Sequence, residues 1–252
     1  MARRRIDVNC DLGETALPWH ESHEPALLRE ISSANVACGG HAGDAASMSA
    51  LCAEAARLGV AIGAQVSYPD RQNFGRVAMD IDHDELMSSL SQQFSALVGA
   101  AEANGTRVAY VKPHGALYNT VVAHQGHAEV VVRLAEHFGV PLFGMPNSLT
   151  ENLAERHGVQ FVREWFADRG YLSNGQLAPR SRSDALVTSQ RLVFERVARA
   201  MKNGEVETVD GTTLQVDFST ICVHSDTPGA VTLLQSVRAA LAQADVSIGA
   251  EW

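Results

Sequence analysis

Polar side chains that can transfer protons or hold anions recur where short apolar runs end. Carboxylates and imidazoles that converge on one mouth supply general acids and bases, and lysine and arginine bind anionic groups. Six segments carry such residues: Asn9–Glu14, Cys38–Asp44, Gln65–Asp70, Lys112–Gly115, Glu164–Arg169 and His224–Pro228. We expect them to form one catalytic site. The catalytic candidates are Asp11, His41, Asp44, Lys112 and His114.

Each candidate also has a purely structural interpretation. Asp44 precedes a helical stretch and can cap it, while Asp11 could belong to a solvated helix start. His41 and His114 could be core histidines with satisfied hydrogen bonds. Lys112 is one of only two lysines against eighteen arginines, and it follows an apolar run, where a charge needs a partner or a ligand. We expect Lys112 to contact an anion or a carbonyl group of a ligand; the alternative is a structural salt bridge across the mouth.

The spacing of the polar residues does not identify a cofactor. A divalent metal is compatible with carboxylates and imidazoles at such a mouth, but neither an HxxxH nor an HExxH pattern is present. No metal ligand is therefore named from the sequence. Phosphate-loop patterns are also absent, so a nucleotide site does not follow from the motifs.

The elements that must position these residues alternate between strand and helix. Seven β-rich runs are predicted strands, at 6–10, 34–38, 60–64, 108–111, 141–145, 159–162 and 220–223. Apolar spacings of three and four predict helices at 44–58, 84–103, 126–138, 148–156, 189–201 and 230–244. This order favours an α/β fold, a distorted (β/α) barrel of about seven strands, with an open doubly wound sheet as the alternative. Both place their sites at the carboxyl ends of the strands.

Composition limits the class of protein. The chain has 252 residues, 46% of them hydrophobic, and a net charge of −9, which argues against a nucleic-acid partner. We expect one domain over 1–252, with loop or hairpin elaborations near 171–181 and 206–217. The four cysteines form no CxxC pair, the basic start of the chain lacks an apolar leader core, and no run is long enough to span a membrane. We therefore expect a cytoplasmic protein without membrane partners.

The same polar segments resemble the LamB/YcsF family. The likeness rests on long motifs that follow one another over nearly the whole chain. They are Asn9–Glu14 (NCDLGE), Ser33–Asp44 (SANVACGGHAGD), Val60–Ala64 with Tyr68–Asp70, Asn73–Arg76 (NFGR), Val111–Asn119 (VKPHGALYN), Glu164 with Phe166–Tyr171, Pro179–Ser181, and Ile221–His224 with Asp226–Ala230. Two departures stand out: Gln65-Val66 replaces a His-Pro pair of the family pattern, and Ser225 replaces a glycine between His224 and Asp226.

The resemblance implies a barrel related to deacetylase and glycosidase barrels. It also implies the role of the A subunit in an ATP-dependent 5-oxoprolinase. With subunits B and C, such an enzyme hydrolyses 5-oxo-L-proline to L-glutamate and consumes ATP as co-substrate. Two other functions stay open: a stand-alone metal-dependent amidase or deacetylase-like hydrolase, and a non-catalytic substrate-binding subunit.

Roles for the residues follow as hypotheses. Asp11 or Asp44 would be the general base, and His114 and His41 would move protons or donate hydrogen bonds. Gln65 is expected to bind rather than to act as acid or base. The residues expected to bind substrate or phosphate are Glu14, Gln65, Tyr68, Arg76, Tyr118, Asp168, Arg169, Arg180, His224 and Asp226.

Overall fold

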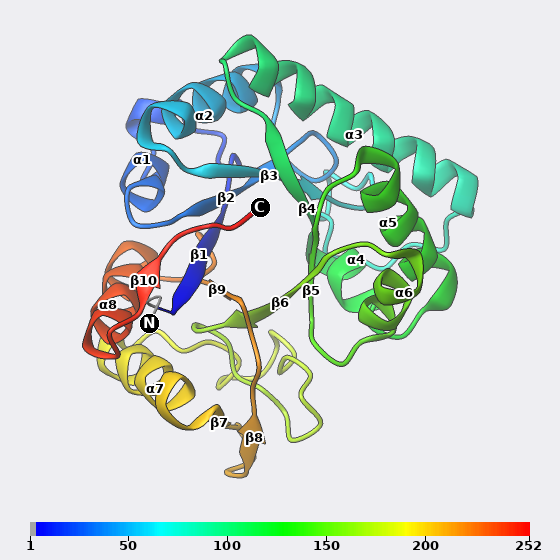
Figure 1. The fold of residues 1–252 in the computed structure, drawn as a ribbon. Coiled ribbons are helices and arrows are strands. Elements are labelled where there is room, and N and C mark those ends of the chain that lie inside the picture. Colours follow the sequence, from blue (N-terminus) through cyan, green and yellow to red (C-terminus); the bar gives the residue numbers. More distant parts are fainter. Residues whose placement is uncertain (1–3) are drawn as a thin grey trace.

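Seven parallel strands form a closed barrel in the computed structural model, which describes residues 4–252 (Figure 1). The strands are β1 Arg5–Leu12, β2 Ser33–Ala37, β3 Ala61–Val66, β4 Val108–Pro113, β5 Leu142–Gly144, β6 Phe161–Phe166 and β9 Thr220–Cys222. Each strand pairs with the next, and β1 pairs with both β2 and β9, which closes the ring. The predicted seven-strand barrel is confirmed, and the alternative of an open sheet is wrong.

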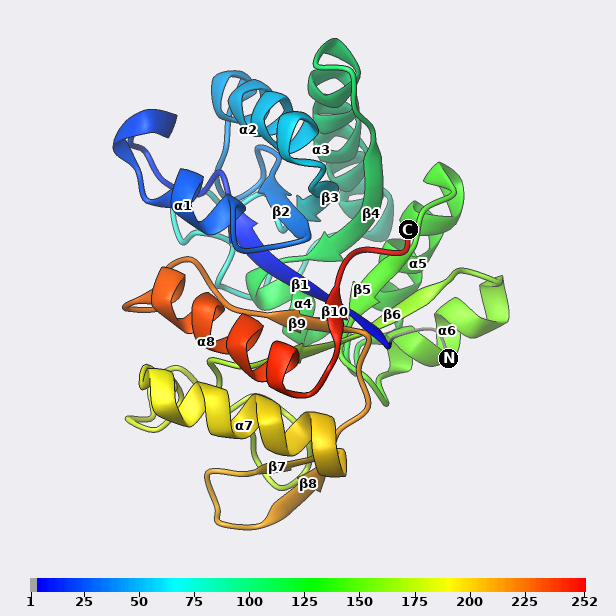
Figure 2. The same cartoon turned by 60° about the vertical axis from the view of Figure 1, so that its left-hand side comes forward.

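Helices surround the barrel on its outside (Figures 1 and 2). The long ones are α2 Ala45–Leu58, α3 His83–Ala103, α5 Gln125–Phe138, α6 Leu149–His157, α7 Gln190–Asn203 and α8 Ala230–Gln243, close to the ranges that the apolar spacing predicts. Three short helices were not predicted: η1 Trp19–Glu21, α1 Glu24–Leu28 and α4 Gly115–Thr120. Helix α4 follows β4 directly and begins at the mouth of the barrel.

Strand β1 carries apolar residues on the face that packs against the helices and polar residues on the face that points into the barrel. Ile6, Val8, Cys10 and Leu12 join the apolar layer beneath the helices. The residues between them are polar and equally buried: Asp7, Asn9 and Asp11. Because side chains alternate across a strand, these three project into the barrel, where they contact other strands. The upper interior of the barrel is therefore polar rather than apolar.

Aromatic side chains close the amino end of the barrel. The rings of Tyr110 and Phe143 stack 3.9 Å apart, and Trp252 packs edge-on against both. Figure 1 shows the C-terminus lying over the middle of the ring. Gly63 leaves room for this packing, because a Cβ there would lie 2.0 Å from the Tyr110 ring. A ligand must therefore enter from the opposite, carboxyl end.

Smaller elements decorate the barrel. Strands β7 Glu205–Glu207 and β8 Thr213–Gln215 pair antiparallel, and Tyr171 forms an antiparallel bridge with Leu177. Strand β10 Ser247–Ile248 pairs with the start of β1. Residues 1–3, part of the basic start discussed above, lie outside the described residues. Within residues 4–252, no helix combines the length and apolar character of a membrane span.

Candidate active site

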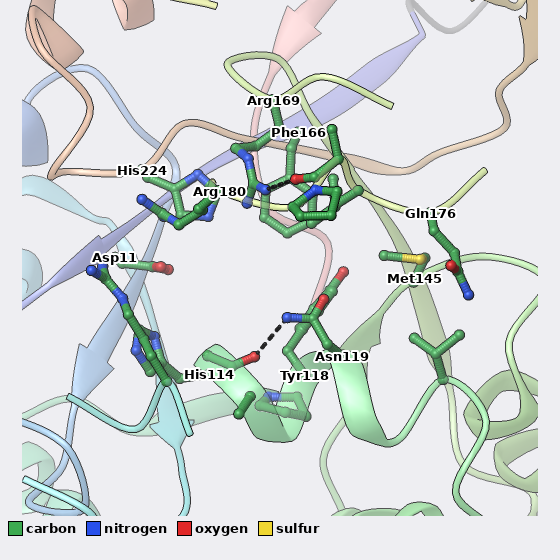
Figure 3. A pocket seen from close by; sticks show the side chains of 18 of the residues that line it. Asp11, His114, Tyr118, Asn119, Met145, Phe166, Arg169, Gln176, Arg180 and His224 are labelled. Atoms are coloured by element: carbon green, nitrogen blue, oxygen red, sulfur yellow. Dashed lines mark hydrogen bonds between the residues drawn. The ribbon is translucent and has the colours of Figure 1, made fainter. Parts of the chain in front are cut away.

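A cavity of about 520 Å³ opens at the carboxyl ends of the strands (Figure 3). It lies between β1, β4, β6, α4 and the segment around residues 176–180. Figure 3 shows His224 and Arg180 on one side of the cavity and Met145 and Gln176 on the other. The predicted site residues that line it are Asp11, Arg76, Lys112, His114, Tyr118, Arg169, Arg180 and His224.

The floor of the cavity is a buried cluster around Lys112. Its Nζ lies 2.8 Å from Glu164 Oε1, 3.1 Å from Asp11 Oδ1 and 3.3 Å from Asn9 Oδ1. Burial disfavours the ammonium ion, but Asp11 and the other acidic neighbours outweigh it and hold the pKa of Lys112 well above its usual value. The three N–H donors have acceptors in Asn9 Oδ1, Asp11 Oδ1 and Cys222 Sγ. The structure thus has the salt bridge across the mouth and no free donor on Lys112 for an anion.

Asp11 is held as a carboxylate. Burial alone would raise its pKa, but the charge of Lys112 outweighs burial and holds the pKa of Asp11 well below its usual range. The Nδ2 of Asn35 also donates to Asp11 Oδ1 over 2.8 Å. A carboxylate with so low a pKa is a weak proton acceptor near neutral pH. The geometry therefore favours an electrostatic role for Asp11 over the predicted role of general base.

Below Asp11 the polar interior continues to Asp7. Asp7 accepts hydrogen bonds from Ser32 and Ser33 at Oδ1 and from Thr220 at Oδ2. Thr220 in turn accepts from Asn9 Nδ2 over 2.7 Å, which links Asp7 to the cavity floor. Burial is the dominant effect and raises the pKa of Asp7 from 3.8 to about 6.

We expect Asp7→Asn to make the free energy of unfolding depend less on pH between about pH 4 and pH 6. Because the folded-state pKa of Asp7 is the higher one, the native chain holds its proton longer than the unfolded chain. The wild type therefore loses stability as the pH rises from about 4 to about 6, and the loss is complete above that window. When the pH is raised from 4.5 to 7.5, the unfolding free energy of the variant relative to that of the wild type should increase by about 2 kcal/mol. Urea unfolding at both pH values measures the difference, and parallel profiles would contradict it.

His224 and Asp168 form an oriented pair on the cavity wall. His224 Nδ1 lies 3.1 Å from Asp168 Oδ2, and the same carboxylate accepts from the His224 backbone N–H and from Thr227 Oγ1. Burial opposes the charge of Asp168, but His224 and these hydrogen bonds outweigh it and lower the pKa of Asp168. An ionised Asp168 keeps the imidazole proton on Nδ1, so Nε2 has its lone pair available on the side that lines the cavity. Among residues 4–252, Nε2 has no hydrogen-bond partner.

Arginines give the cavity mouth a positive charge. Arg76 and Arg180 both contact Asp226 Oδ2, at 2.6 and 3.2 Å. The buried Arg169 donates to the carbonyl oxygens of Ala185 and Ala178. Within residues 4–252, its guanidinium forms no ion pair with an acidic side chain. Three guanidinium groups thus face one carboxylate, and the mouth keeps a positive excess suited to a small anion.

A second cluster lies beside the cavity and joins four predicted residues. His41 and His114 stack with ring centroids 3.7 Å apart. Glu14 Oε1 lies 3.1 Å from His41 Nε2 and 3.4 Å from His114 Nδ1, and Gln65 Nε2 donates to both Glu14 and His114. Burial and the neighbouring His41 hold the pKa of His114 well below its usual value. Both nitrogens of each ring contact protein groups, so neither histidine offers a free nitrogen for proton transfer to a substrate.

Two predicted residues belong neither to the cavity lining nor to the clusters beside it. Asp44 is exposed and caps α2: its Oδ1 accepts from the Ser47 N–H over 2.8 Å, while Ser47 Oγ accepts from the Asp44 N–H. The Asp44 carboxylate therefore caps the helix, and it does not line the cavity, where a general base would have to lie. Tyr68 is fully buried, and its hydroxyl lies 2.7 Å from His127 Nδ1 in the layer between barrel and helices.

Three residues of the cavity floor are not among the site residues expected from the sequence: Asn9, Asn35 and Glu164. Asn9 lies on the predicted strand 6–10, two positions before Asp11, and Glu164 follows the predicted strand 159–162, four positions before Asp168. Residues an even number of positions apart in a strand lie on the same face. A polar residue spaced in this way from a predicted site residue can therefore be expected to point into the barrel as well.

The chain was compared with known proteins. Residues 6–251 match the model of the LamB/YcsF family. A protein of Streptomyces coelicolor, named as the A subunit of 5-oxoprolinase, is 47% identical over 97% of this chain and 99% of its own length. One of Kocuria rhizophila with the same name is 43% identical over 96% and 97%.

Solved structures agree with the family match. The lactam utilization protein of Thermus thermophilus is 34% identical, with a TM-score of 0.91 over 98% of this chain and all of that one. A truncated 3-deoxy-D-arabino-heptulosonate 7-phosphate synthase of Thermotoga maritima, 9% identical with a TM-score of 0.52, shares the fold alone. A family match across the barrel and both clusters of the site, together with full-length relatives, shows that this chain belongs to the LamB/YcsF family.

Proposed function

We propose that the chain is the A subunit of a cytoplasmic, ATP-dependent 5-oxoprolinase that acts on 5-oxo-L-proline together with B and C subunits. The names of the full-length relatives support hydrolysis of a cyclic amide. The use of ATP and the two partner subunits extend that function and come from the family resemblance.

The observation that carries the proposal is a small cavity with a positive mouth and an oriented histidine on its wall. 5-Oxo-L-proline is a small anion, and its carboxylate suits the guanidinium groups of Arg76, Arg169 and Arg180. That contact would leave the lactam ring inside the cavity, where His224 Nε2 is available. The cationic mouth equally suits the charge of a phosphorylated intermediate.

The chemistry explains why ATP is needed. A lactam carbonyl is a poor electrophile, and transfer of the γ-phosphoryl group of ATP to its oxygen activates the ring carbon. Water then adds to that carbon and the C–N bond breaks with protonation of nitrogen, which gives an acyl phosphate. A second water releases phosphate and leaves L-glutamate, with ADP formed in the first step. Each water must lose a proton as it attacks, and we infer that His224 Nε2 accepts it, with Asp168 stabilising the imidazolium.

This mechanism gives the floor a different role from the one expected from the sequence. Lys112 is ion-paired with Asp11 and Glu164, so these three residues would fix the shape and potential of the cavity rather than exchange protons. Asp226 would hold Arg76 and Arg180 in position at the mouth.

The test is release of L-glutamate from 5-oxo-L-proline by the purified chain, with and without ATP and with and without the two partner subunits. We expect release only when ATP and both partners are present. Turnover by the isolated chain without ATP would support the stand-alone hydrolase instead. Full reconstituted turnover by a chain with Asp168 and His224 both replaced would support a non-catalytic binding subunit.

A further inference from the structure

The cluster of Glu14, His41 and His114 contains more hydrogen-bond acceptors than donors. His114 Nε2 lies 3.2 Å from the carbonyl oxygen of Phe74, which can only accept, so Nε2 carries the proton of the neutral ring. Its Nδ1 therefore carries a lone pair, which accepts from Gln65 Nε2 over 2.9 Å. Ser67 Oγ donates to the Tyr68 carbonyl and so accepts from His41 Nδ1, which leaves the lone pair of His41 on Nε2.

These lone pairs converge on the carboxylate of Glu14. Its Oε1 is 3.1 Å from His41 Nε2 and 3.4 Å from His114 Nδ1, and all three atoms lie within 4.8 Å of one another. Gln65 Nε2 donates to both Glu14 Oε1 and His114 Nδ1. Glu14 Oε1 and His41 Nε2, however, face each other as two acceptors 3.1 Å apart, and such a pair is repulsive unless a cation lies between them. Ligands about 2.0–2.1 Å from a tetrahedral zinc ion are about 3.4 Å apart, which matches these separations.

Gln65 supplies an independent observation. Its side chain is fully buried against the cluster, yet its Oε1 has no hydrogen-bond partner among the described residues. A half-turn of the carboxamide exchanges its oxygen and nitrogen without changing its shape. That turn would present Oε1 where Nε2 now lies, next to Glu14 and His114, as a fourth oxygen or nitrogen donor.

The surrounding residues hold the donors in place, as a preformed metal site requires. Buried Glu24 accepts from the backbone N–H groups of Gly13 and Glu14 over 2.9 and 3.1 Å, which fixes the turn that carries Glu14. Ser67 and the Phe74 carbonyl orient the two imidazoles through their other nitrogens. The Phe74 ring packs edge-on against both histidines.

We propose that Glu14, His41 and His114 bind one divalent transition-metal ion of the zinc class, with Gln65 as a weaker fourth ligand. Two imidazole nitrogens and a carboxylate oxygen suit zinc, cobalt(II) or nickel(II) better than magnesium or calcium, which favour all-oxygen sites. His114 also lines the cavity, so the ion would lie at the cavity wall.

The experiment is a titration of the full chain, freed of metal by a chelator, with cobalt(II) followed by visible absorption. We expect one equivalent to bind with the intense bands of a four-coordinate ion, and zinc to displace it. His41→Ala should weaken binding at least about 100-fold, beyond the loss typical of a residue that only orients a ligand. His157→Ala, which removes an exposed histidine paired with Glu136 over 3.0 Å, is the matched control and should bind as the wild type.

Gln65→His tests the same site through an expected increase in metal affinity. An imidazole is a stronger zinc-class ligand than an amide oxygen, so this variant should bind cobalt(II) about 10-fold more tightly. Absence of saturable binding in the wild type would overturn the proposal and leave a proton as the bridging cation. Equal affinity in the wild type and in folded His41→Ala, or no gain in Gln65→His, would place the ion elsewhere and also overturn it. The titration contains neither lactam nor ATP, so its outcome is independent of the proposed function.

Discussion

His224→Ala is expected to lower ATP-dependent glutamate release by the reconstituted enzyme about 10²- to 10⁴-fold, the range for loss of a general base. His224 is the one proposed proton acceptor whose Nε2 faces the cavity without a protein partner among residues 4–252. The effect should fall on kcat more than on KM, because the arginines that bind the substrate carboxylate remain. Turnover measured at saturating 5-oxo-L-proline and ATP gives the comparison.

Asp168→Asn tests whether Asp168 acts by orienting His224 or only by maintaining the fold. The amide can donate to His224 Nδ1 and so favours the tautomer with the proton on Nε2, where a base must have its lone pair. We expect a loss of similar order in kcat, with a folded chain by circular dichroism. His157→Ala is again the control, since it breaks a histidine–carboxylate pair remote from the cavity and should leave kcat unchanged. A His224→Ala enzyme with more than a tenth of wild-type kcat would exclude the role of base.

Lys112→Met is expected to cost about 3–5 kcal/mol of unfolding free energy, the largest stability effect that we predict. Lys112 is 2% exposed, and its removal leaves the carboxylates of Asp11 and Glu164 buried without a counter-charge. Methionine keeps most of the side-chain volume, so the loss reports the charge rather than a cavity. Urea unfolding at pH 7.5 measures it.

A second change should restore part of that stability. In Lys112→Met with Glu164→Gln, one of the two unpaired charges is removed, and we expect a recovery of at least about 1 kcal/mol. Lys202 is the other lysine of the chain and lies exposed near the end of α7. Lys202→Met should therefore change stability by less than about 0.5 kcal/mol. A loss below about 1 kcal/mol for Lys112→Met would show that the cluster does not depend on its ammonium ion.

The sequence located the segments of the site better than it located the roles within them. Runs such as Val108–Val111 and the helical spacing after Gln125 predict elements within a few residues, because strand and helix periods are local. The barrel then brings the polar ends of different strands together. Roles depend on contacts between those ends, which no local pattern specifies.

Asp44 and Lys112 show this limit. Asp44 stands in a long conspicuous motif, yet its carboxylate caps α2, a local function that competes with a site role. Lys112 was expected to meet an anionic ligand, and its ion-pair partners are instead Asp11 and Glu164, which lie on other strands far away along the chain. Its unusual position in an apolar strand revealed that a partner exists but not which one.

By itself, the sequence determined the α/β alternation, the seven strands, the acidic overall charge and the polar strand ends, because periodicity, composition and motif order are written along the chain. Only the tertiary structure decided which strand ends meet: Asp168 with His224, Lys112 with Asp11 and Glu164, and Glu14 with His41 and His114. The physical reason is that closure of the barrel sets distances between residues far apart in sequence. Those distances determine which donors are already satisfied and which remain available for a ligand.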